Sequence, residues 1–207
     1  MKGRGANRRA WVLSLLSIAI VGVASLSTGC GSSSQLAPPT PSVSASGADA
    51  GPTAAEVERY FKRIHPGMRH LAWANASMFL ASQDRKESKY SLATFEYRMA
   101  ARDYRKAASH LEKVADSEEP LSPETLALVP PALAEYAECV RDLNRIYEAA
   151  GYIDLEVVLA RWDKLEPRFE EAEKRLNRAL QTLYADLAAM ADETGAPAPQ
   201  WLKDGSN

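Results

Sequence analysis

The stretch from Asp154 to Asp192 decides the fold of this chain, and it reads DLEVVLARWDKLEPRFEEAEKRLNRALQTLYADLAAMAD. Apolar residues recur in it every seven positions, and a second set follows three positions after the first four: Leu155, Trp162, Phe169, Leu176, Leu183 and Met190, then Val158, Leu165, Ala172 and Ala179. This spacing is typical of an amphipathic helix and is incompatible with a strand. At about 1.5 Å per residue the helix would be roughly 60 Å long. Its apolar seam needs partner helices, because a helix with one exposed apolar stripe is unstable alone.

Three further segments have the same spacing and supply those partners. A capping box at Thr53–Glu56 predicts the start of the first helix. A second possible capping box at Asp84–Glu87 begins a helix that runs to about Ala115. A third helix is expected between Ser122, an N-cap followed by a first-turn proline, and Gly151.

Prolines and glycines define the architecture further. Pro66 and Pro167 lie opposite the seams and are expected to kink their helices, and Pro130 with its neighbour must bend the third helix near its start. No alternating strand pattern occurs between residues 53 and 193, and the connections are short. The sequence therefore predicts an all-α fold, an up-down-up-down four-helix bundle with kinked long helices at residues 53–193. A signal peptide and a disordered linker precede the bundle, and residues 194–207 are expected to form a disordered tail.

The amino terminus has the order of a secretory signal. Residues 2–9 are basic, residues 10–28 are apolar or small, and Gly29-Cys30 follows at the end of the run. The junction resembles the lipobox of bacterial lipoproteins, although Ser27 occupies the usual aliphatic position. The resemblance implies a signal peptide at residues 1–29, acylation of Cys30 with palmitate-type chains, and a lipid-anchored protein on the extracytoplasmic face of the cell membrane. The alternative is an uncleaved transmembrane anchor. Residues 30–52 form a Ser, Gly and Pro linker that carries one charge and cannot bury a core.

Charge and motif content exclude several functions. The net charge is -2, and after residue 30 the chain holds 21 basic and 27 acidic residues, so nucleic acid is not expected as a partner. No histidine has a glutamate three residues before it, as di-iron bundles require, and no haem attachment, nucleophile elbow or phosphate loop occurs. Cys139 lies beside a seam and is expected to be a small buried side chain. We therefore expect no enzymatic activity, no metal and no cofactor.

An excess of apolar surface is the most informative feature of the helical segments. Leu92, Phe95 and Met99 lie opposite the tyrosine seam of their helix, and Trp73 points away from the seam of the preceding one. Kinks that rotate the helix faces would bury these residues in the core. The other reading is a partner surface rimmed by charge. The leading hypothesis is a lipoprotein whose bundle binds an envelope protein or itself and has a non-enzymatic interaction or structural role.

A ligand site between the helices is the alternative. Tyr90, Tyr97 and Tyr104 recur every seven residues, and Asn75 interrupts the seam of the first helix. A cavity lined by these four residues would make the protein a small-ligand or metal-binding lipoprotein of the envelope. The pair Trp201-Leu202 is a candidate lid over the apolar surface.

Overall fold

The computed structural model describes residues 51–117, 122–150 and 152–205. Contacts divide the chain after Gly51, and every helix described here belongs to the unit Pro52–Ser206. The elements, in order, are α2 (Ala54–Lys86), α3 (Tyr90–Ala115), the 3-10 helix η1 (Glu124–Leu128), α4 (Val129–Ala149), α5 (Leu155–Thr194) and α6 (Gln200–Gly205). All regular secondary structure in the described residues is helical, which confirms the all-α class. The predicted signal peptide, Cys30 and the linker as far as residue 50 lie outside the described residues.

The two predicted helix boundaries with the clearest local signals are confirmed. The Thr53 hydroxyl accepts a hydrogen bond from the Glu56 backbone N–H at 3.4 Å, and the Glu56 carboxylate accepts one from the Thr53 N–H at 2.8 Å. This reciprocal capping box satisfies donors that the first turn of α2 would leave unpaired. At the other end of the unit, Gly195 follows α5 with φ 68, a conformation that glycine adopts without a steric penalty.

The predicted capping box at Asp84–Glu87 is wrong. Helix α2 continues through Asp84 to Lys86, and α3 begins only at Tyr90. The chain reverses at Ser88, which has φ 61, and the Lys89 N–H donates to the Asp84 carbonyl at 2.7 Å. The last turn of α2 therefore uses residues that the local pattern assigned to the next helix.

Prolines interrupt the third helical segment as the sequence predicts. Residues 124–128 form the short 3-10 helix η1, and Pro130 and Pro131 occupy the first positions of α4. Proline is tolerated there because the first N–H groups of a helix have no partner within the helix. Helix α2 continues past Pro66, and α5 continues past Pro167.

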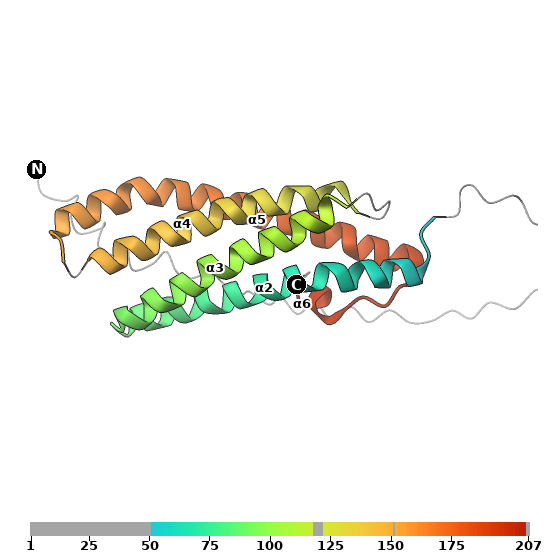
Figure 1. Ribbon diagram of the computed structural model, residues 1–207, viewed down its shortest axis with the longest axis horizontal. Helices are drawn as coiled ribbons and strands as arrows, with labels where there is room; N and C mark the ends of the chain where they lie inside the picture. Colours follow the sequence, from blue (N-terminus) through green and yellow to red (C-terminus); the bar gives the residue numbers. More distant parts are fainter. Residues whose placement is uncertain (1–50, 118–121, 151, 206–207) are drawn as a thin grey trace, which may run out of the picture. The chain divides into compact units, whose positions relative to one another are not determined.

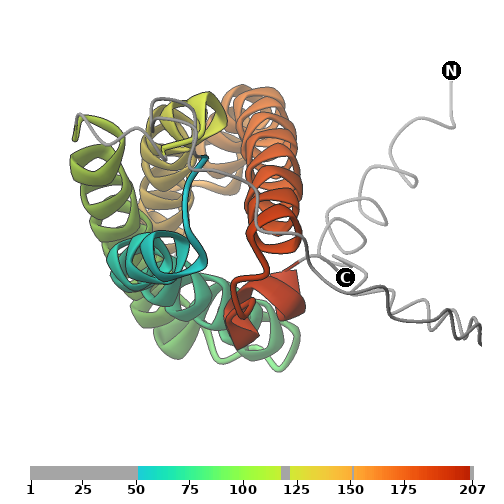
Figure 2. The same ribbon diagram turned by 90° about the vertical axis from the view of Figure 1, so that its right-hand side faces the viewer.

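The four long helices lie side by side within the unit (Figures 1 and 2). Each packs extensively on the next one in the chain, whereas α2 and α5 touch over a short length. Gly67 faces Leu111 across the α2–α3 contact, and Asn75 bonds Tyr104, so residue numbers rise along α2 as they fall along α3. The arrangement is compatible with a four-helix bundle.

The seam of α5 is buried over most of its length. Leu165, Leu176 and Leu183 belong to the core, and Trp162 packs against it from a half-buried position. The prediction is wrong for Leu155, which is 68% exposed. Leu155 lies in the first turn of α5, next to the connection from α4.

The prediction of a disordered tail is wrong for residues 196–205. Ala196 and Leu202 are buried, and Gln200–Gly205 form α6. The Trp201 ring packs edge-on against Phe61 of α2, with ring centroids 6.1 Å apart. Burial of two apolar side chains compensates for ordering this proline-containing segment.

Candidate functional site

The predicted partner residues lie on the outer surface of α2 and α3. Trp73 is 49% exposed, Leu92 51% and Phe95 52%, while Met99 is half-buried. We call these four residues the α2–α3 patch. The alternative, in which rotated helix faces bury the second stripe of α3, does not hold for Leu92 and Phe95. A cluster of this kind is unusual on a surface that contacts only water.

Trp73 and Met99 lie at the same level of the helix pair. His70 Nδ1 is 3.3 Å from Asp103 Oδ1 across the α2–α3 contact, and the His70 ring meets the Trp73 ring edge-on at 5.2 Å. Met99 precedes Asp103 by one turn, on the same face of α3. Trp73 therefore lies beside the turn of α3 that carries Met99.

Cations border the patch. The Arg69 guanidinium lies 4.9 Å from the centre of the Trp73 ring, which is cation–π geometry. Arg102 and Lys106 reach the Asp103 carboxylate at 3.7 and 4.0 Å and remain about half exposed. Positive groups thus lie on this surface beside Trp73 and above the buried Asp103 carboxylate.

A buried histidine–aspartate pair joins α2 to α3 beneath these cations. The Asp103 side chain is 6% exposed, and the His70 ring stacks on His110 with centroids 5.5 Å apart. His70 Nδ1 and Asp103 Oδ1 are buried but lack the alignment of a hydrogen bond. Burial lowers the pKa of His70, and Lys106 and His110 add to this, while the Asp103 carboxylate opposes it. Burial therefore favours the neutral form of the His70 imidazole.

Sequence reasoning missed Asp103. The signal was present, because Asp103 lies three residues after Ala100 and four before Ala107, two small seam residues that recur between the tyrosines of α3 and are buried. A residue between two seam positions on one helix face is buried when a neighbouring helix comes close.

The four residues of the alternative ligand site do not form one site. The Tyr104 hydroxyl donates to Asn75 Oδ1 at 2.7 Å, so these two residues are joined. Tyr97 is fully buried, and its ring stacks on Tyr147 at 5.5 Å. Its hydroxyl has no hydrogen-bond partner among the described residues. Tyr90 is more than half exposed at the start of α3.

Helix α4 adds Tyr136 and helix α5 adds Glu173 to the polar pair of Asn75 and Tyr104. The Tyr136 ring lies edge-on to Tyr104 at 5.0 Å and tilted to Phe169 at 5.2 Å. Burial raises the pKa of Tyr104 and of Tyr136. Burial is also the largest cause of a raised pKa at Glu173 on α5. A small polar cluster thus draws one residue from each long helix.

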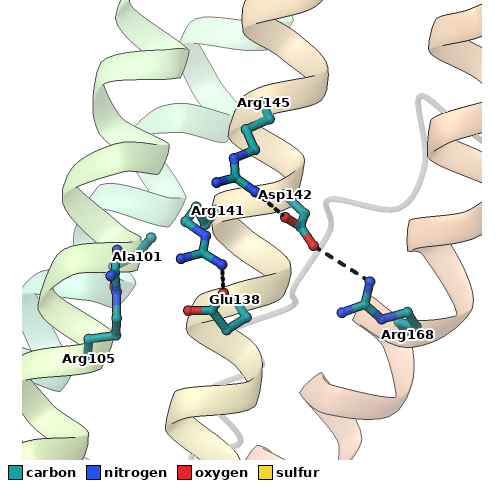
Figure 3. Close-up of polar contacts among 7 residues, drawn as sticks. All are labelled: Ala101, Arg105, Glu138, Arg141, Asp142, Arg145 and Arg168. Atoms are coloured by element: carbon teal, nitrogen blue, oxygen red, sulfur yellow. Dashed lines mark hydrogen bonds and ion pairs between the residues drawn. The ribbon is translucent and has the colours of Figure 1, made fainter.

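Several charged side chains of α4 and α5 pair with each other. Asp142 is 3.2 Å from Arg145 on its own helix and 3.6 Å from Arg168 on α5, and Glu138 pairs with Arg141 (Figure 3). Figure 3 also shows Arg105 of α3, whose Nε donates to the Ala101 carbonyl at 3.3 Å. These pairs hold the α4–α5 surface in a salt-bridged arrangement, and each exposed pair contributes little to stability.

Neither an activated thiol nor a metal-holding group of side chains is seen in the part of the chain that the structure describes. Cys139 is buried, as expected, and burial raises the pKa of its thiol, the opposite of thiolate activation. Within residues 51–117, 122–150 and 152–205, no three His, Cys, Asp or Glu side chains are placed to hold a metal ion.

Comparisons with protein-family models, curated proteins and solved structures find no match for this chain. Across the described part of the chain, none of the helices combines the length and the apolar character needed to cross a membrane.

Proposed function

We propose that this chain is a lipid-anchored lipoprotein on the extracytoplasmic face of the cell membrane, and that its helical bundle is a non-enzymatic interaction module of the cell envelope. The observation that carries the proposal is the α2–α3 patch, in which Trp73, Leu92 and Phe95 are each about half exposed and bordered by cations. The order of basic, apolar and small residues before Cys30 supports the anchor.

We also propose the finer architecture as an up-down-up-down bundle with kinks at Pro66 and Pro167. Strong packing between successive helices and the short connections at residues 87–89 and 150–154 support this topology. In this arrangement α2 and α3 form one hairpin and α4 and α5 the other. The α2–α3 patch then belongs to a single hairpin, which gives the module one defined contact face.

The anchor is tested in bacteria that express the full chain. Intact-mass measurement of the membrane-extracted protein should show loss of residues 1–29 and acyl chains on Cys30. Cys30→Ala should move the protein from the membrane fraction to the soluble extracytoplasmic fraction, because a single lipid attachment point holds the helical unit. Cys139→Ala is the matched control and should leave both the mass of the acyl adduct and the fractionation unchanged. An unmodified Cys30 in a cytosolic product would contradict the proposal.

A small-ligand or metal-binding role is the second candidate. The polar cluster of Asn75, Tyr104, Tyr136 and Glu173 favours it, since polar groups from four helices are typical of sites inside bundles. In this cluster the two tyrosines are buried, Glu173 is half-buried and Asn75 is exposed. Native mass spectrometry and elemental analysis of the purified protein test it. Bound cargo that is lost in Tyr104→Phe and kept in Tyr90→Phe would support this role, and a protein free of cargo would count against it.

A further inference from the structure

The apolar residues of the α2–α3 patch share their surface with a further exposed side chain. Leu80 follows Trp73 by seven residues on α2 and is about half exposed. Leu92, Phe95 and Met99 follow the corresponding three- and four-residue spacing along α3. The two helices therefore present adjacent apolar stripes on the outside of one hairpin.

Charge is divided unequally between the two hairpins. Residues 54–115, which include α2 and α3, hold twelve Lys and Arg against seven Asp and Glu, a net charge of +5. Residues 124–194, which include η1, α4 and α5, hold eight against fifteen, a net charge of -7. The α2–α3 patch thus lies on the basic hairpin of a helical unit whose net charge is negative. An anionic surface is the partner that complements the charge of this hairpin.

We propose that the outer face of α2 and α3 docks on the anionic lipid surface of the membrane. Trp73, Leu92 and Phe95 enter the headgroup boundary, where amphipathic aromatic rings and leucine side chains gain most from leaving water. Arg69, Arg102 and Lys106 contact lipid phosphates, while the acidic α4–α5 hairpin faces away. The α2–α3 patch is the interaction surface of the proposed function, and the lipid is its partner. The proposal rests on the proposed function only for the anchor, which brings the patch to the membrane.

The lipid anchor and the linker that follows Cys30, which acts as a tether, put the membrane within reach of this face. The 21 residues between Cys30 and Pro52 can span at most about 70 Å, and the path along α2 from Ala54 to Leu80 is about 40 Å. The tether therefore permits the whole outer face to reach the membrane that holds the lipid. Local attachment also raises the effective concentration of lipid, so weak docking suffices.

A second copy of the chain is a poorer occupant. A two-fold dimer through this face would bring two basic hairpins together, and their like charges would repel. Some of the acids on α4 and α5 that could pair with this face, such as Asp142 and Glu138, are already engaged within one molecule. A lipid surface offers phosphates to the same cations, and these phosphates are not already paired with side chains of this chain.

The experiment uses the helical unit, residues 52–207, whose buried core lies within residues 57–202 of the described chain and so should fold without the anchor. Co-sedimentation measures its binding to vesicles of equal phosphatidylglycerol and phosphatidylcholine, and to vesicles of phosphatidylcholine alone. We expect at least tenfold tighter binding to the anionic vesicles, and a loss of that preference in high salt. A blue shift of tryptophan emission should disappear in Trp73→Phe, because Trp162 and Trp201 pack against the core.

Two pairs of variants separate the apolar and charge contributions. Leu92→Ser with Phe95→Ser should weaken binding to anionic vesicles at least tenfold, whereas Leu128→Ser, an equally exposed leucine on η1, should change it less than twofold. Arg102→Gln with Lys106→Gln should weaken it about thirtyfold, from about 1 kcal/mol per cation. The control Arg145→Gln with Lys174→Gln removes the same charge from α4 and α5 and should change binding less than threefold.

Folding is monitored by circular dichroism and denaturant unfolding for every variant. Because Arg102 and Lys106 also contact Asp103, Arg69→Gln tests the charge contribution without touching that carboxylate. It should weaken binding about fivefold.

Three outcomes would overturn the inference. The first is equal binding to anionic and neutral vesicles, and the second is an equal loss in the patch variants and in their controls. The third is a dimer of the helical unit, seen by ultracentrifugation, that dissociates in Leu92→Ser with Phe95→Ser, since a second copy would then occupy the face. The acylation of Cys30 is read separately by intact mass, so failure of the anchor and failure of the docking face are distinguishable.

Discussion

Leu183 and Leu155 occupy equivalent positions in the heptad pattern of α5 but have different surroundings. Leu183 is fully buried among the other helices, and Leu155 is two-thirds exposed in the first turn. The free energy that an apolar side chain contributes depends on the area it removes from water and on the contacts it makes there. Equivalent sequence positions should therefore differ in their effect on stability.

We expect Leu183→Ala to lower the free energy of unfolding by about 2–5 kcal/mol, because it opens a cavity in the core. Leu155→Ala should change it by less than about 0.5 kcal/mol, the usual range for an exposed position. Urea unfolding of both variants measures the difference. Similar losses in the two variants would contradict the observed burial of the α5 seam.

Glu173 gives a prediction that depends on pH. Burial raises the pKa of its carboxyl in the folded state above the unfolded value, so the ionised form at neutral pH destabilises the fold. Glu173→Gln should therefore increase the free energy of unfolding at pH 7, by up to about 1 kcal/mol for a partly buried group. The gain should shrink as the pH falls through the raised pKa and vanish below about pH 4, where Glu173 is protonated in both states.

Thermal unfolding between pH 3 and 8 tests this prediction. Glu166→Gln, seven residues earlier on the same face of α5, is the matched control and should stay within about 0.5 kcal/mol of wild type at each pH. A gain from Glu173→Gln that is as large at pH 3 as at pH 7 would show that charge burial is not its cause.

At the scale of elements, α2 and α3 approach each other so closely at Gly67 that a larger residue would meet Leu111. A Cβ atom added at Gly67 would lie 2.7 Å from Leu111 Cδ2 and 2.8 Å from its Cγ. Leu111 is fully buried, so its side chain has little room to move away. Glycine in mid-helix is unfavourable by about 1 kcal/mol relative to alanine, and it is retained here where it permits close approach.

Gly67→Ala should destabilise the protein by about 1–2 kcal/mol, because overpacking outweighs the gain in helix propensity. In a Leu111→Ala background the clash is absent, and the same substitution should stabilise the protein by about 1 kcal/mol. A double-mutant cycle by urea unfolding measures this change of sign. If Gly67→Ala stabilises the unmodified chain, the two helices are further apart than described.

At the scale of the whole molecule, the carboxyl-terminal segment connects two helices that otherwise touch little. Helix α6 contacts α5, and Trp201 packs against Phe61 of α2. Leu202 is 2% exposed, so this short helix contributes to the same core as the long ones. The segment closes one part of the side between α2 and α5.

Leu202→Ala should lower the free energy of unfolding by about 2 kcal/mol and increase protease cleavage after residue 195, since α6 would lose its main buried side chain. Gln200→Ala, an exposed change in the same helix, should leave both unchanged within about 0.5 kcal/mol. Limited proteolysis with mass spectrometry and urea unfolding measure the two effects. Equal stability of the two variants would mean that α6 does not belong to the core.

At the candidate site, the local sequence pattern predicted some features, and others depended on contacts between residues distant in the chain. The helical wheel separated Leu92, Phe95 and Met99 from the seam of α3, but it left open whether kinks would bury them. Only the packed helices show that Leu92 and Phe95 are exposed while Met99 is half-buried. The His70–Asp103 contact was not predicted, because it joins residues 33 positions apart whose meeting depends on the α2–α3 register.

By itself, the sequence determined the helical class, the position of most of the α5 seam, the capping box at Thr53 and the glycine end of α5. These features depend on spacing and hydrogen bonds within a few residues, so they are recorded locally. The tertiary structure alone decided that Leu155 is exposed, that α2 continues to Lys86 and that α6 folds back. Burial at the ends of helices depends on how far their neighbours extend, and that length is set by residues distant in the chain.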